Sequence, residues 1–282
     1  MLTVFNIGID VYVDDVFIVE TAEAVGSAFH IFKAVWALLG FQLEDDKQQT
    51  PTKTPILLGA EITLTLNWIT ARLPGRKRKG LINETRQVLP NGQLAPSQAA
   101  KLRGRLGFSH SLLFGRMGRA WLNPLTARQY SKSLGRFRPI TAELKETPTW
   151  WIEILYNAIP RRTLLTPPKP PVVYSDAAGT GHIGFYLRKG GEIRAGHTHL
   201  HEWFVKITGM YEYEMAGAIY ALHAASLCWP GRPILLRVDN SAAAAGIFRG
   251  NCQSPFGATL VAVFWAIDAA CSTPIWIEEV RS

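Results

Sequence analysis

Three acidic side chains in the C-terminal part of the sequence stand where regular elements are expected to converge. Asp176 lies on one expected strand, and Asp239 directly follows another, over 234–238. Glu214 stands near the start of an expected helix over 213–227. If the second strand lies beside the first and the helix packs over both, the carboxylates meet. Burying such a cluster costs several kcal/mol unless cations neutralise it. The spacing therefore predicts a site for divalent ions.

The elements that must position these acids follow from the apolar periodicity. Before the helix, short apolar runs separated by glycine-rich turns predict an antiparallel meander of three strands over 172–177, 181–187 and 190–194. After the strand at 234–238, the pattern predicts two helices over 241–248 and 256–271 and a last strand over 274–280. The fold class expected here is α/β (α+β), with a mixed five-stranded sheet and flanking helices.

Three short motifs carry a family resemblance over 172–282. Y-S-D-A at 174–177, E-M-A-G-A at 214–218 and V-D-N at 238–240 resemble, in order and spacing, the first three catalytic motifs of the ribonuclease H fold. The resemblance implies that Asp176, Glu214 and Asp239 bind two Mg²⁺ (or Mn²⁺) ions that support cleavage of the RNA strand of an RNA–DNA hybrid. The family's fourth acid follows the last strand, beyond Ser282, so we expect weak or absent nuclease activity.

Other readings of these acids stay open. Each acid alone could be a solvated strand end or a charge favoured by a helix N-terminus. Glu212 competes with Glu214, which we prefer because apolar residues follow it at core spacing. Glu278 or Glu279 on the last strand could replace the fourth acid. His197, His199 and His201 are expected in a surface loop, with a zinc site on one strand face as the alternative.

Asp14 and Asp15 form a second acidic pair, inside the apolar run V-Y-V-D-D-V-F-I-V at 11–19. A hairpin would direct them to opposite faces and leave one free to bind a divalent ion. The alternative is a simple turn, because aspartate tolerates turn dihedrals.

The order of motifs around this pair resembles the C-terminal half of a reverse transcriptase palm. Y-V-D-D is followed by a helical pattern over 22–39, then L-G-F, Lys47 and L-G-A-E-I. The resemblance, to a retrotransposon reverse transcriptase/ribonuclease H polyprotein fragment, implies that Asp14 and Asp15 serve a metal site and that Lys47 protonates departing pyrophosphate. The family's fingers and first palm aspartate precede this hairpin, and only Met1–Asp10 precede it here, so we expect no polymerisation by this chain alone.

The positive charge is concentrated in one segment. From Arg72 to Arg138 there are 15 Lys or Arg residues and one acid, Glu84, giving 15 − 1 = +14, whereas the whole chain carries +8. Such a single-sign stretch favours a polyanion, here an RNA–DNA hybrid or an RNA or DNA duplex. The segment resembles a helical thumb and connection, with expected phosphate contacts from Arg76, Lys77, Arg78, Lys79, Lys101, Arg103, Arg105, Arg116 and Arg119. The first four could instead be a nuclear import signal.

Length and composition bound the remaining choices. The 282 residues have room for about two domains, and their 48% hydrophobic content indicates a folded chain. We predict a palm remnant over 1–75, a helical block over 76–160, a Pro-rich linker over 161–171 and a ribonuclease H-like domain over 172–282. No window predicts a membrane span or signal peptide, so the expected location is intracellular, in nucleus or cytoplasm. No small-molecule cofactor beyond metal is indicated. The alternative function is a catalytically dead nucleic-acid-binding remnant.

Overall fold

The computed structural model describes residues 2–4, 7–12, 15–45, 48–113, 116–131, 140–157, 160–164, 168–200, 209–271 and 274–280. The chain divides into two compact units, 1–64 and 65–282. Each unit is described by itself.

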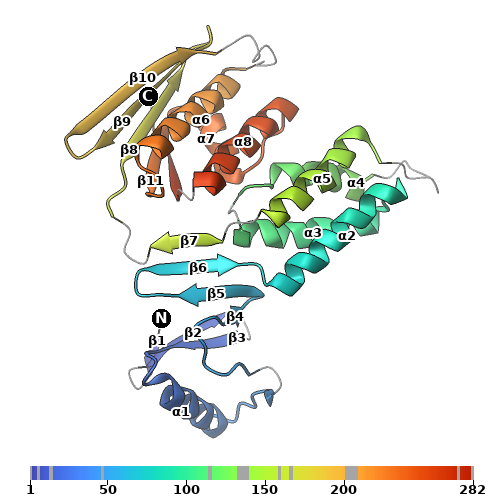
Figure 1. Ribbon diagram of the computed structural model, residues 1–282, viewed down its shortest axis with the longest axis vertical. Coiled ribbons are helices and arrows are strands. Elements are labelled where there is room, and N and C mark those ends of the chain that lie inside the picture. The colour runs from blue at the N-terminus through green and yellow to red at the C-terminus, as the bar shows by residue number, and fades with distance from the viewer. Residues whose placement is uncertain are drawn as a thin grey trace. The chain divides into compact units, whose positions relative to one another are not determined.

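The smaller unit contains two antiparallel strand arrangements and one helix (Figure 1). Strands β1 (Leu2–Val4), β2 (Ile7–Tyr12) and β3 (Asp15–Val19) are consecutive neighbours, and Tyr12 pairs with Asp15. Helix α1 (Val25–Leu38) buries Ala28 and Phe32, one turn apart. Strands β4 (Ile56–Leu57) and β5 (Ala60–Leu64) form a hairpin whose turn residues, Leu58 and Gly59, both have positive φ.

The larger unit begins with a block of helices. Strand β6 (Trp68–Arg72) pairs with β7 (Arg161–Leu164), so the first residues of the expected linker are a strand. Between them lie α2 (Gly75–Asn91), α3 (Pro96–Leu113), the 3₁₀ helix η2 (Ala120–Leu122), α4 (Asn123–Gln129) and α5 (Ala142–Tyr156). Helix α2 includes Pro90 and ends at Asn91, where Gly92 with φ of 58° forms the C-cap.

The rest of the larger unit is a mixed five-stranded sheet in the order β10-β9-β8-β11-β12. Strands β8 (Val172–Ala177), β9 (His182–Lys189) and β10 (Glu192–His199) are antiparallel, and β11 (Ile234–Val238) runs parallel to both β8 and β12 (Ile275–Glu279). Helix α6 (Met210–Cys228) packs on β8 and β9, and α8 (Pro255–Cys271) packs on α6. Helix α7 (Ser241–Arg249) follows β11 directly (Figure 1). The predicted mixed α/β fold, a five-stranded sheet with flanking helices, is confirmed.

Strand β10 is longer than the sequence indicates. It pairs residue for residue with β9 up to the pair His199 and His182, so the loop expected around His197 and His199 is wrong for these two residues. Both side chains are exposed, and the His199 Nε2 atom lies 3.0 Å from the Thr180 carbonyl oxygen. His201 lies outside the described residues.

One hydrophobic core extends through both parts of the larger unit. Its members include Leu106 and Trp151 from the helical block and Leu222, Leu236 and Phe264 from the sheet and its helices, and all five are fully buried. Because the same cluster joins the two parts, they form one packed body rather than two cores separated by solvent.

Candidate functional site

The three C-terminal acids meet at one end of the sheet. Asp176 lies on β8, and Asp239 directly follows the parallel neighbour β11, where Val238 pairs with Ser175. Glu214 lies in the first half of α6. One carboxylate oxygen from each residue lies within 4.8 Å of the others. The structure therefore brings together the trio that the sequence predicts.

A glycine on α6 allows the close approach of the helix to the strand. A Cβ atom at Gly217 would lie 3.4 Å from the Asp176 carbonyl oxygen and 3.7 Å from the Ala177 Cβ atom. The helix backbone thus packs on β8 with no intervening side chain, and Glu214, one turn earlier, reaches the strand end. The Ala177 backbone also donates a hydrogen bond to Glu214.

The surroundings of Glu214 oppose its negative charge. Burial, then Asp239 and then Asp176 raise the pKa of its carboxyl from 4.5 to about 7, although the Ala177 backbone hydrogen bond acts in the opposite direction. The side chain is 3% exposed, and its Oε2 atom has no hydrogen-bond partner among the described residues. A divalent cation would relieve both conditions, because hard cations prefer carboxylate oxygens and neutralise converging charges.

The other candidate acids lie elsewhere. Glu212 is buried and accepts hydrogen bonds from Tyr211 Oη at 3.0 Å and Ser254 Oγ at 2.6 Å. Glu278 accepts a hydrogen bond from Arg237 Nε at 2.7 Å. Glu279 lies at the end of β12. Of these and Glu214, only Glu214 belongs to the acidic group that converges within the described residues.

The N-terminal candidates lie largely outside the described residues. Asp14 and Lys47 are not described, and Asp15 is described only as the first residue of β3. A metal or polymerase role for these residues stays a prediction.

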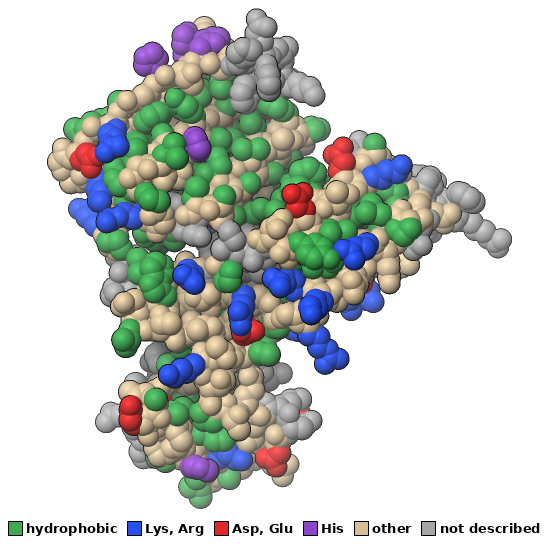
Figure 2. Space-filling model, viewed as in Figure 1, with side chains coloured by type: hydrophobic (Ala, Val, Ile, Leu, Met, Phe, Trp, Pro, Cys, Tyr) green, Lys and Arg blue, Asp and Glu red, His purple; other side chains and the backbone are tan. Residues whose placement is uncertain are grey.

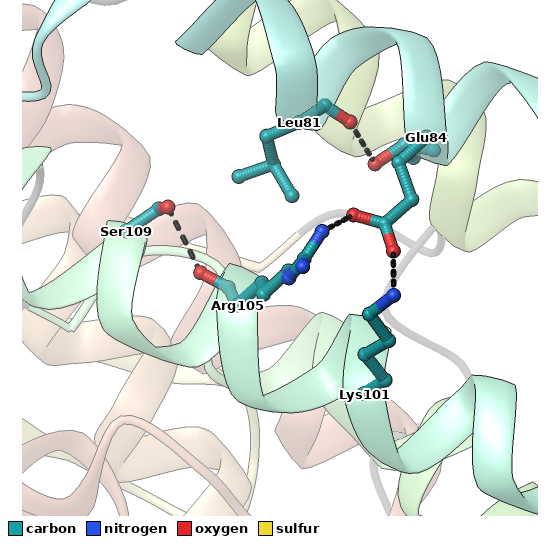
Figure 3. A network of polar contacts seen from close by, with 6 residues as sticks. Leu81, Glu84, Lys101, Arg105 and Ser109 are labelled. Atoms are coloured by element: carbon teal, nitrogen blue, oxygen red, sulfur yellow. Dashed lines mark hydrogen bonds and ion pairs between the residues drawn. The ribbon is translucent and has the colours of Figure 1, made fainter. Parts of the chain in front are cut away.

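The basic side chains of the larger unit fall into groups with different partners. Figure 2 shows Lys and Arg side chains gathered over the helical block. Lys101 and Arg105, one turn apart on α3, both bind Glu84 of α2, with the Lys101 Nζ atom 3.9 Å from Glu84 Oε1 (Figure 3). The only acid of the basic segment therefore pairs with two of its cations and neutralises one unit of their charge.

Among the other basic residues predicted to contact phosphate, some side chains are exposed and others are half-buried. Arg76, Lys77 and Lys79 are exposed in the first turn of α2, and Arg78 is half-buried. Arg116 is also half-buried, with its guanidinium carbon 3.9 Å from the centre of the Phe248 ring. This cation–π contact joins the helical block to the sheet domain, so Arg116 has an internal role that the sequence does not indicate.

Sequence reasoning missed a groove between the helical block and the segment after α7. It has a volume of about 540 Å³ and is lined by residues of α3, η2, α4 and Asn251. Gly104 and Gly107 of α3 line it too. A Cβ at Gly104 would meet nothing within 4 Å, and one at Gly107 would meet only Leu122 Cδ1 at 3.8 Å. Gly104 therefore faces open space.

Comparisons with known proteins give structural matches alone. No protein-family model matches the chain, and no curated protein matches it. RNase H1 from the halophilic archaeon Halobacterium salinarum NRC-1 is 18% identical, with a TM-score of 0.35 over 40% of this chain and 86% of that protein.

Two foamy viral structures align over nearly the whole chain. The foamy viral protease-reverse transcriptase in complex with dsDNA is 16% identical, with a TM-score of 0.46 over 98% of this chain and 55% of that one. The dRH form of that protein with dsDNA is 14% identical, with a TM-score of 0.44 over 98% and 46%. The chain thus spans about half the length of these two proteins.

No helix within the described residues is long and apolar enough to span a bilayer.

Proposed function

We propose that the chain binds nucleic acid and hydrolyses the RNA strand of an RNA–DNA hybrid at Asp176, Glu214 and Asp239. The observation that carries this proposal is the convergence of three carboxylates, one of which, Glu214, has a buried oxygen without a hydrogen-bond partner among the described residues. A merely structural acid at that depth is normally paired, whereas a cation site needs such oxygens left available.

The donor set fits Mg²⁺ or Mn²⁺, since all three side chains offer oxygen and none offers sulfur or nitrogen. When bound, such ions supply an activated water and stabilise the charge that develops on the leaving oxygen. The chain's own residues define the site: β8 and β11 fix the two aspartates side by side, and α6 holds Glu214 against them. Asp176 and Asp239 are exposed, so a phosphodiester can approach from solvent.

Hydrolysis is tested with a labelled RNA–DNA hybrid in Mg²⁺ and, separately, in Mn²⁺. We expect slow cleavage of the RNA strand by the native chain, consistent with the weak activity expected from the sequence, and a further loss of at least a hundredfold in Asp176→Asn. The matched control is Glu153→Gln, which removes one exposed carboxylate from α5 and should leave the rate unchanged. Cleavage that persists in Asp176→Asn would contradict the proposed site.

The alternative function is nucleic-acid binding without hydrolysis. The basic helical block favours binding whether or not the acidic site is active. Salt-sensitive binding of the hybrid, with metal binding at the trio and no cleavage, would support this alternative. Metal binding is followed separately as the rise in melting temperature with Mn²⁺, which Asp176→Asn should abolish.

We further infer that the smaller unit derives from a reverse transcriptase palm and that the chain comes from a retroelement polyprotein. The support is the Y-V-D-D sequence at the connection of β2 and β3, where Tyr12 pairs with Asp15. In a primer-extension assay we expect no synthesis by this chain alone. Synthesis that is lost in Asp14→Asn would instead identify an active polymerase.

A further inference from the structure

The groove beside α3 has the chemistry of an anion site. Arg103 and Arg119 line it, both side chains are exposed, and neither forms an ion pair within the described part of the chain. Among the described residues, the hydrogen-bond partner of Arg103 Nη1 is the neutral Gln129 amide, whose Oε1 atom lies 3.5 Å away. Lys101 and Arg105, in contrast, are held by Glu84. The two arginines of the groove therefore keep their full charge available to an external partner.

Two amides also line the groove. Asn123 Nδ2 donates to Asn251 Oδ1 at 2.7 Å, and Asn251 Nδ2 donates to Asn123 Oδ1 at 3.0 Å. Each amide nitrogen carries two hydrogens, and this reciprocal pair uses one of each. Within the described residues, the second hydrogen of either amide has no protein acceptor. Asn251 Oδ1 also accepts from Cys252 N at 2.8 Å, which further fixes its orientation.

Two glycines leave space along one side of the groove. The side of α3 that lines the groove carries Gly104 and Gly107, and a Cβ at Gly104 would have open space around it. Two exposed cations, oriented N–H donors and the lack of an acidic side chain among the described lining residues complement a row of phosphates.

We propose that this groove binds the sugar–phosphate backbone of a nucleic-acid strand, with Arg103 and Arg119 contacting successive phosphates and Asn123 and Asn251 donating to phosphate oxygens. The inference rests on the proposed function, because it assigns the acidic trio's substrate a second, distant contact.

Helix α7 sets the spacing between the groove and the acidic trio. Asp239 immediately precedes its N-cap residue Asn240, and Asn251 immediately follows its C-cap residue Gly250. Nine helical residues, 241–249, span about 14 Å at about 1.5 Å each. With a rise of about 3.4 Å per nucleotide, the bound phosphates lie about four or five nucleotides from the strand segment at the trio.

The groove is tested by hybrid binding in EDTA, where hydrolysis cannot contribute. Fluorescence anisotropy at several salt concentrations gives the slope of log K against log[salt]. For Arg103→Gln/Arg119→Gln we expect a slope smaller by about 2 and at least tenfold weaker binding at low salt. Arg103→Lys/Arg119→Lys should keep the native slope.

The matched control is Arg188→Gln/Arg232→Gln, which removes two exposed arginines that do not line the groove. An equal loss in the control and in the groove variant would overturn the groove assignment. Failure of the native chain to bind the hybrid at all would instead overturn the proposed function. Tighter binding of a nucleoside triphosphate than of a twelve-nucleotide strand, lost in the groove variant, would replace the backbone by a mononucleotide as the ligand.

The spacing is tested by single methylphosphonate linkages placed along the strand. Fe²⁺ in place of Mg²⁺, with ascorbate and hydrogen peroxide, marks the nucleotides beside the trio by hydroxyl radicals without requiring hydrolysis. We expect neutral linkages about four or five nucleotides from the marked position to weaken binding by the native chain but not by the groove variant. Sensitivity that is spread evenly, or that persists in the variant, would contradict the proposal.

Discussion

Glu214 is the residue whose titration should affect stability most directly. Its ionised form is disfavoured in the folded chain by burial and by two neighbouring aspartates, so its pKa is raised from 4.5 to about 7. The folded state therefore binds the carboxyl proton more tightly than the unfolded state does. The stabilisation that comes from this protonation is fully present below pH 4.5 and is lost as pH rises through 7.

We predict that Glu214→Gln raises the free energy of unfolding at pH 8 in metal-free buffer. The gain is at most about 3 kcal/mol, because one pKa unit corresponds to about 1.4 kcal/mol. Near pH 4 the variant and the native chain should be equally stable. Urea unfolding at both pH values measures this, with Glu153→Gln as the control. A variant that is less stable at pH 8 would contradict the assigned electrostatics.

At the scale of elements, the distance between α6 and β8 sets where Glu214 lies relative to Asp176 and Asp239, and therefore the geometry of the proposed metal site. Gly217 permits that contact, and its missing side chain leaves only the width of a Cβ atom before the Asp176 carbonyl. The position should therefore tolerate a methyl group and exclude anything larger.

We predict that Gly217→Leu lowers Mn²⁺ affinity at least tenfold, because the helix must move away from the strand and carry Glu214 with it. Gly217→Ala is the matched control and should bind Mn²⁺ like the native chain, since its Cβ meets ordinary van der Waals distances. Calorimetric titration compares the two. Native affinity in a folded Gly217→Leu chain would show that helix position does not govern the site.

At the scale of the whole molecule, the helical block and the sheet domain share one core. Arg116 packs on Phe248, and a Cβ at Gly250, which has φ of 69°, would lie 2.8 Å from Arg116 Cβ. The reciprocal amide pair of Asn123 and Asn251 joins the same two parts.

We predict that residues 65–282 unfold as one cooperative unit. Native-state hydrogen exchange in the full chain should give the same opening free energy for peptides from α5 and α6, because neither core can open without the other. Exchange of α5 at a much lower denaturant concentration than α6 would contradict a shared core.

The sequence predicts those features that depend on local pattern. The strand over 234–238 agrees with β11, and the motif acids converge because a parallel strand pair and a covering helix leave few other arrangements. Features that depend on distant pairs could not be predicted. Asn123 and Asn251 are 128 residues apart, and nothing local to either indicates the groove. The sequence pattern underestimates the edge strand β10 because its last four residues, G-H-T-H at 196–199, lack the large apolar side chains that usually mark a strand.

The salt bridges of Glu84 have a consequence for how strongly the chain attracts polyanions in general. This carboxylate forms ion pairs with Lys101 and Arg105 of α3, so part of the segment's positive charge is neutralised within the protein (Figure 3). Substitution of this one residue would free both side chains and raise the net charge from +8 to 8 + 1 = +9. We expect retention on heparin or bulk RNA to increase as a result, because Glu84 neutralises part of the positive charge that attracts polyanions.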